Sequence, residues 1–407
     1  MFTYLQSFYT SHKSKFDYIV SILNYAILIL YGLFVFEAFL RSTTFEINWH
    51  PYYHLSLKVI LILLVLGKSL LKFMDNIPLY MLLGFCSIGF LLAYLQGNHG
   101  ILLELILFTI AFVDVDYKKI LYTFTLIISI SLFIIIIASQ SHILNNLIYR
   151  TAEGTERISF GIHYPTDFAS YILYLCLSLV FIRKKSISFF EIGLMYILSY
   201  MLLYFCLART STICLIILAS LTLLYKIKCT YFNNRNSIIF KPIIYLFTLA
   251  TPICMFVSVG ISYLYTDQNR IFRKLDFLFS NRLSLGKETF NNFDIKLFGQ
   301  NIQMHGNGGY TQAWLNYSSI GKGGYNFIDS SYLSILFRYG LFVFICVIIL
   351  FTLTAFFARK HRDYVTLIII AIIAVHCMIE HHMLDLNYNP FMFILISSYY
   401  KRQEGHS

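Results

Sequence analysis

Long apolar segments recur along almost the whole chain, and they constrain its fold more than any other feature. A membrane-spanning helix needs about 20 mostly apolar residues, and by that measure the sequence predicts about twelve spans. We expect them at residues 18–40, 53–71, 77–95, 100–114, 119–139, 167–183, 187–207, 211–226, 242–265, 329–357, 364–382 and 387–400. The sequence therefore predicts one all-α integral membrane domain over residues 1–407.

The overall composition supports this fold class and argues against a soluble nucleic-acid-binding protein. Hydrophobic residues make up 58% of the chain and charged residues 13%, whereas a soluble domain has roughly 25% charged residues. The net charge of +11 is explained by basic cytoplasmic loops in a membrane protein. Nearly all of the 8 cysteines lie in apolar segments, so no extracellular disulfide framework is predicted.

The distribution of Lys and Arg predicts the orientation in the cell membrane. With a cytoplasmic N-terminus, the short outside loops hold only Arg41, Arg150, Arg157 and Arg209, and most other basic loop residues fall inside. Such a bias favours two cytoplasmic termini. The first apolar run is too long for a signal-peptide core, so we interpret it as an uncleaved span.

Two predicted outside segments are long enough to carry function. One covers residues 140–166, and the other covers residues 266–328 between the ninth and tenth spans. We expect the second to form a small extracellular subdomain, because connections of that length are usually functional.

Charged side chains from separate outside segments could form one site. Arg157 lies in the first long segment, Arg209 at the end of the seventh span, Arg282 in the long loop and Asp329 before the tenth span. Guanidinium groups match phosphate oxygens with paired hydrogen bonds, and an acid at a helix start is stabilised in its ionised form. The alternatives are a snorkelling Arg209, a solvated Arg282 and an Asp329 that only caps a helix.

Arg338 follows Asp329 within the same predicted span, where a charge is costly unless it faces protein or water. We expect it to line the same cavity or to pair with an intramembrane acid, and Glu104 and Glu380 are the candidates.

Short motifs occur in a fixed order from about residue 157 to residue 391. They are Arg157-Ile-Ser-Phe-Gly-Ile-His-Tyr-Pro165, Ala208-Arg-Thr-Ser211, Asn281-Arg-Leu283, Leu297-Phe-Gly299, Ile328-Asp-Ser-Ser-Tyr-Leu333, Tyr339-Gly340, and a closing segment from Glu380 to Asn389-Pro-Phe391. The set resembles the motifs of Wzy-type capsular and exopolysaccharide polymerases of the Gram-positive type, in the O-antigen polymerase family. Ala208 and Ser330 depart from that pattern, which has Ser and Asn there.

The resemblance implies a GT-C-like membrane glycosyltransferase of the capsule or exopolysaccharide pathway. Such an enzyme joins glycan repeat units carried on a polyprenyl (undecaprenyl) diphosphate at the outer face of the cytoplasmic membrane. The implied partners are the lipid-linked donor and acceptor, membrane lipids, a chain-length regulator and a flippase, with no nucleic acid. An O-antigen-ligase-like transferase and a lipid-linked oligosaccharide flippase remain alternatives. The sugars, their linkage, the product length and the oligomeric state are not predicted.

The same resemblance suggests a role for each candidate residue. Arg157, Arg209 and Arg282 would hold the diphosphate where charge develops on the leaving group. Asp329 would act as the general base, with His163 and His305 as competitors, and the reaction would invert the anomeric centre. Contacts to the glycan or cavity would come from Trp314, Tyr332, Arg338 and Glu380.

No cofactor is predicted, and we expect the reaction to be metal-independent. His376 and Glu380 stand four residues apart, as do His381 and Asp385, so each pair could share a helix face. Because this spacing matches no recognised ligand pattern, hydrogen bonding or substrate positioning is the favoured interpretation.

Overall fold

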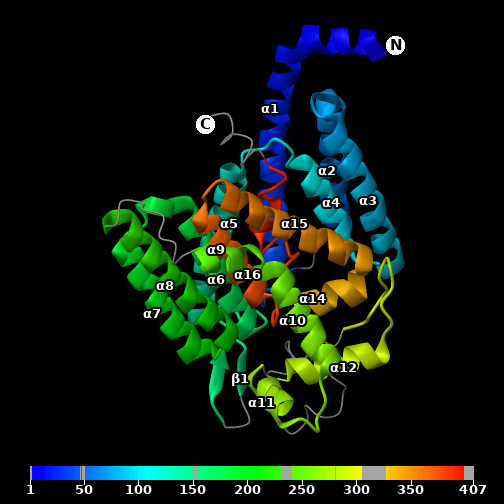
Figure 1. Cartoon of the computed structure of the whole chain (residues 1–407). Helices are drawn as coiled ribbons and strands as arrows, with labels where there is room; N and C mark the ends of the chain where they lie inside the picture. Colours follow the sequence, from blue (N-terminus) through cyan, green and yellow to red (C-terminus); the bar gives the residue numbers. More distant parts are fainter. Residues whose placement is uncertain are drawn as a thin grey trace.

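The chain folds into a mostly helical bundle, shown as a computed structural model in Figure 1. The structure describes residues 2–45, 47, 51–150, 154–231, 241–279, 281–304 and 327–397. The first elements are α1 (Phe2–Arg41), α2 (Pro51–Lys72), η1 (Phe73–Asp75), α3 (Ile77–Gly97), α4 (Gly100–Ala111), α5 (Tyr117–Gln140), β1 (Ile148–Arg150), β2 (Glu156–Ile158), α6 (Pro165–Arg183), η2 (Lys184–Ser186) and α7 (Phe189–Met201). They are followed by η3 (Leu202–Cys206), α8 (Arg209–Tyr231), α9 (Lys241–Thr248), α10 (Ala250–Leu264), α11 (Arg270–Leu278), α12 (Arg282–Asn292), α14 (Ser331–Ser334), η6 (Ile335–Tyr339), α15 (Leu341–Lys360), α16 (Tyr364–His376) and η7 (Pro390–Phe393).

Within the described residues, seven helices are long and apolar enough to cross a membrane. The bent pair α9–α10 makes an eighth if it counts as one span. These helices support a multi-pass membrane protein, with fewer long spans than the sequence predicted. Two predicted spans correspond to α4 and α16, which have 12 and 13 residues and are shorter than the about 20 residues that a crossing needs.

The predicted span 242–265 is broken into α9 and α10, which meet at 62°. Pro252 lies in the first turn of α10. It has no N–H to donate to the carbonyl of Thr248, the last residue of α9, so the helical hydrogen-bond ladder is interrupted there.

The predicted span 329–357 is also broken, at Gly340. Gly340 has a φ of 94° and packs against Gly299, whose φ is 75°. A Cβ atom on Gly340 would lie 2.6 Å from the carbonyl oxygen of Leu297. The N–H of Gln300 donates to the carbonyl of Arg338 at 3.0 Å. This contact between Gly299 and Gly340, here called the glycine joint, ends the short buried helix α14–η6, and α15 begins after it.

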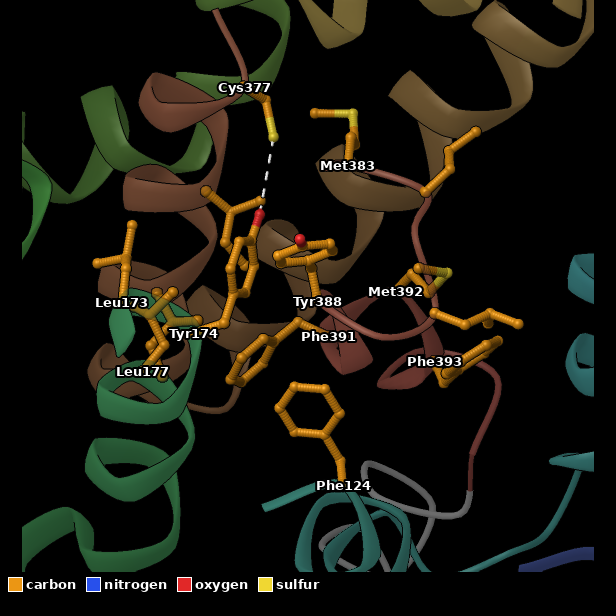
Figure 2. Packing of buried hydrophobic residues seen from close by; sticks show 14 of the residues in the cluster. Phe124, Leu173, Tyr174, Leu177, Cys377, Met383, Tyr388, Phe391, Met392 and Phe393 are labelled. Atoms are coloured by element: carbon orange, nitrogen blue, oxygen red, sulfur yellow. Dashed lines mark hydrogen bonds between the residues drawn. The ribbon is translucent and has the colours of Figure 1, made fainter. Parts of the chain in front are cut away.

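The prediction of a last span at 387–400 is wrong, because its described part forms turns and the short helix η7. Asn389 shapes this segment: its side chain accepts the N–H of Phe391 at 3.1 Å and donates to the carbonyl of Met383 at 2.8 Å. Figure 2 shows Tyr388 and Phe391 packed in the core near Tyr174 of α6. The apolar residues of this segment therefore serve a protein core.

The predicted outside segments gather at one end of the molecule. Figure 1 places β1, α11 and α12 at the end opposite the N-terminal part of α1. Strands β1 and β2 pair antiparallel, with Tyr149 opposite Arg157. The described parts of segments 140–166 and 266–328 thus contribute side chains to the same end of the bundle.

Candidate active site

Two of the predicted site residues form a direct ion pair. The guanidinium of Arg282, at the start of α12, lies 2.8 Å from the carboxylate of Asp329, just before α14. The Arg282 side chain is 22% exposed and that of Asp329 is 11% exposed, so the pair is largely shielded but reachable from solvent. Ser330 occupies the N-cap position of α14, so Asp329 is not the helix cap that we considered as an alternative.

The start of α12 is held in place by an acid from the preceding helix. Asp276 of α11 accepts the backbone N–H groups of Leu283 and Ser284 at 2.9 and 3.0 Å. These are N–H groups of the first turn, which have no partner within the helix. Asp276 thereby fixes the backbone on which Arg282 stands.

A very small pocket, with a cavity volume of about 10 Å³, lies beside the ion pair. Its lining comes from α12 and from the segment leading into α14: Arg282, Leu285, Gly286, Thr289, Phe327, Ile328, Asp329, Ser330 and Leu333. A Cβ atom on Gly286 would lie 2.6 Å from the Ser262 hydroxyl and 2.9 Å from a methyl group of Leu333. Only glycine therefore allows α12 to approach α10 and α14 this closely.

Glu380 is buried next to this pair. The Ser331 hydroxyl in α14 donates to the backbone carbonyl of Glu380 at 2.6 Å and accepts the N–H of Met383 at 3.2 Å. Burial raises the pKa of the Glu380 carboxyl, while the charge of Arg282 lowers it and that of Asp329 raises it. The Glu380 carboxylate is therefore within electrostatic reach of both members of the pair.

Arg157 on β2 lies within electrostatic range of the same group of charges. Its Nε atom donates to the carbonyl of Cys206, the last residue of η3, at 3.0 Å. Burial lowers the pKa of Arg157, the charge of Glu380 raises it and that of Arg282 lowers it. The structure thus brings Arg157, Arg282, Asp329 and Glu380 together from four separate segments.

Arg209 and His163 make no hydrogen bond or ion pair with this group in the part of the chain that the structure describes. Arg209 is exposed at the start of α8 and makes no ion pair within the part of the chain that the structure describes. The backbone of His163 is held by Ser42 and Tyr149, at 2.8 and 2.6 Å. Burial lowers the pKa of the His163 imidazole, and the charge of Asp167 raises it.

Tyr332 and Arg338 have partners that the sequence did not predict. Tyr332 is fully buried, and its hydroxyl donates to the carbonyl of Ala374 in α16 at 3.0 Å. Arg338 donates to Ser334 at 3.4 Å and lies over the ring of Tyr339 at 5.4 Å.

Neither acid proposed as a partner of Arg338 pairs with it. Glu104 instead contacts His54 and Lys58, both at 3.0 Å. Burial raises the pKa of a different acid, Asp385, but the hydrogen bond from His382 outweighs it and lowers that pKa, and the charge of Arg338 adds a smaller effect in the same direction. His305 and Trp314 lie outside the described residues, so their predicted roles stay predictions.

A buried histidine beside Glu380 is the main feature that sequence reasoning missed. His382 lies between two carboxylates, with its Nδ1 3.3 Å from Asp385 and its Nε2 3.5 Å from Asp167. Its ring stacks on Tyr388 with 3.9 Å between centroids. Helix α16 ends at His376, so the residues that follow do not repeat with the helical period that the sequence suggested.

Glu380, His381 and His382 are the described residues that come nearest to a metal-ligand set. One potential ligand atom from each lies within 4.8 Å of the others. Because both ring nitrogens of His382 face carboxylates, ion pairing is the arrangement that the geometry favours.

Comparison with known proteins adds no assignment. No protein-family model matches the chain, and no curated protein or solved structure is found to be similar to it.

Proposed function

We propose that this protein is a membrane glycosyltransferase that polymerises glycan repeat units carried on a polyprenyl diphosphate. The proposal rests on the resemblance of the ordered motifs and on one structural observation. That observation is the cluster of Arg157, Arg282, Asp329 and Glu380 at one end of the bundle. Two guanidinium groups and two carboxylates in a shielded place suit transfer of a sugar from a diphosphate leaving group.

The proposed step forms one bond and breaks one. A hydroxyl oxygen of the acceptor glycan attacks the anomeric carbon of the donor, and the bond from that carbon to the diphosphate oxygen breaks. The carboxylate of Asp329 takes the hydroxyl proton, and the guanidinium groups of Arg282 and Arg157 stabilise the charge on the departing polyprenyl diphosphate. Attack from the face opposite the leaving group inverts the anomeric centre.

The 2.8 Å ion pair gives Arg282 a second role in this scheme. While it contacts Asp329, it favours the ionised carboxylate that a general base requires. When the diphosphate binds, the same guanidinium can turn toward the phosphate oxygens, since it offers several N–H donors.

A polymerisation assay with purified protein tests the proposal. Given a lipid-linked repeat unit, the wild-type protein should build a ladder of product lengths, and Asp329→Asn should abolish it. Asp294→Asn is the matched control, because Asp294 lies in the same outer region with an exposed side chain. A full ladder from the Asp329→Asn protein would remove Asp329 from the mechanism. One product of fixed length from the wild type would instead favour a ligase.

The break between α9 and α10 favours a second candidate, a flippase for the lipid-linked unit. Transporters often place substrates at discontinuous helices, and these two helices meet at 62° within one predicted span. Movement of the lipid-linked unit across vesicle bilayers without glycosidic bond formation would support transport and contradict the polymerase.

A further inference from the structure

Helix α11 has an exposed basic face that the proposed chemistry does not use. Arg270, Arg273, Lys274 and Phe277 line one shallow hollow along this helix, as expected for positions that share a helix face. Two large apolar side chains of this helix are exposed as well: Phe277, which lines the hollow, is 74% exposed, and Ile271 is 68% exposed. Cations beside exposed apolar groups on a short helix are typical of a helix that lies in a membrane interface.

The opposite face of α11 is committed to the protein. Asp276 is 6% exposed, and it accepts N–H groups at the start of α12. Because this acid is turned inward, it does not neutralise the basic face. Within the described residues, Arg270, Arg273 and Lys274 have no ion-pair partner.

The end of α10 holds α11 close to the end of a candidate membrane span. The broken span α9–α10 ends at Leu264, and α11 begins at Arg270, so the connection reaches at most about 20 Å. The Tyr265 hydroxyl shortens that distance, because it donates to Asp276 at 3.3 Å. Tyr263 is 58% exposed at the end of the span, where aromatic side chains commonly mark the headgroup level.

We infer that α11 is an interfacial helix whose Arg270, Arg273 and Lys274 bind the phosphate groups of anionic lipids. Ile271 and Phe277 insert beside them toward the acyl chains. Three positive charges complement lipid phosphate, and the two apolar side chains select a bilayer surface over a soluble phosphate compound. This inference holds for either candidate function, because it depends only on the helix and its position at the end of a span.

Hydrogen exchange of the full-length protein in lipid nanodiscs tests the inference at the level of one segment. We expect the amides of α11 to exchange more slowly in phosphatidylglycerol discs than in phosphatidylcholine discs, by up to about a hundredfold, because each of the three basic side chains near an anionic surface contributes about fivefold to binding. The triple variant Arg270→Ala, Arg273→Ala, Lys274→Ala should lose this difference. The double variant Arg270→Lys, Arg273→Lys should keep it, which separates loss of charge from loss of folding.

The matched control removes three exposed cations elsewhere. This control is the triple variant Lys15→Ala, Lys118→Ala, Lys185→Ala. It lowers the net charge by the same amount as the triple variant in α11, and it should leave the lipid response of α11 unchanged. Equal exchange of α11 in both lipids would overturn the inference. The same protection from inorganic diphosphate added to phosphatidylcholine discs would also overturn it, because soluble phosphate would then be the ligand.

Discussion

Gly299 packs against Gly340 backbone to backbone, at positive φ angles of 75° and 94°. A Cβ atom on Gly299 would lie 2.7 Å from the carbonyl carbon of Tyr339, and one on Gly340 would lie 2.6 Å from the carbonyl oxygen of Leu297. Two motifs far apart in the sequence, Leu297-Phe-Gly299 and Tyr339-Gly340, are therefore two halves of one structural joint.

Replacing either glycine should destabilise the protein strongly. Gly299→Ala and Gly340→Ala each combine a backbone conformation that disfavours side chains with a steric collision, and we expect each to lower the free energy of unfolding by about 2–4 kcal/mol. Thermal unfolding in detergent measures the effect. Gly193→Ala in α7 is the control, since nothing lies within 4 Å of the added carbon, and it should be neutral or stabilising by up to about 1 kcal/mol. Equal midpoints of thermal unfolding for all three variants would show that the glycine joint does not stabilise the fold.

The Arg282–Asp329 pair should contribute measurable stability as well as activity. We expect Arg282→Ala and Asp329→Ala each to lower the free energy of unfolding by about 1–3 kcal/mol, with the double variant losing less than the sum. The control is the pair Arg150–Glu156, with a similar separation of 3.0 Å but side chains 71% and 49% exposed. Its coupling should be at most about 1 kcal/mol. Additive losses at positions 282 and 329 would indicate that the two side chains do not interact in solution.

Tyr332 should matter for folding and not for turnover. Tyr332→Phe removes the bond to the Ala374 carbonyl and should lower the free energy of unfolding by about 1 kcal/mol, with the product ladder unchanged. Tyr80→Phe is the control, because the Tyr80 hydroxyl is buried without a hydrogen-bond partner in the described structure; its removal should be neutral. A folded Tyr332→Phe protein that makes no ladder would show that this hydroxyl contacts substrate.

Hydropathy alone predicted the parts of the fold that lipid contact determines. The helices around residues 18–40, 77–95 and 119–139 all have counterparts among the long apolar helices of the structure. The segment 387–400 misled this reasoning, because a buried protein core selects the same apolar residues as a bilayer. Hydropathy has no information on which of the two surrounds a side chain.

The expected proximity of two site residues, Arg282 and Asp329, agrees with the structure, whereas their roles stay predictions. Asp329 and Arg282 had to face water or each other, and they form an ion pair. The sequence did not predict that Arg338 lies near Asp385. Arg338 comes just before the helix break at Gly340, and Asp385 lies in the turns after His376, so no helical period relates their positions. Such relationships follow from tertiary packing, and the sequence pattern contains no signal for them.

The position of His382 between Asp167 and Asp385 makes stability depend on pH. Burial disfavours the charged imidazole, but the two carboxylates outweigh it and raise the pKa of His382 to about 10. The unfolded chain has a histidine pKa of about 6.5. The contribution of the charged ring is therefore complete below pH about 6.5 and is lost as the pH rises toward 10.

Thermal unfolding of the wild type and of His382→Gln at pH 6, 8 and 10 measures this contribution. The variant should be destabilised at pH 6 by a few kcal/mol, on the order expected for a broken buried ion pair, and the gap to wild type should narrow as the pH rises. Exposed His142 supplies the control, and His142→Gln should track the wild type throughout. A gap that stays constant from pH 6 to pH 10 would mean that His382 is neutral in the folded protein. Its two carboxylate neighbours would then have to be neutralised by Arg338 or by a proton of their own.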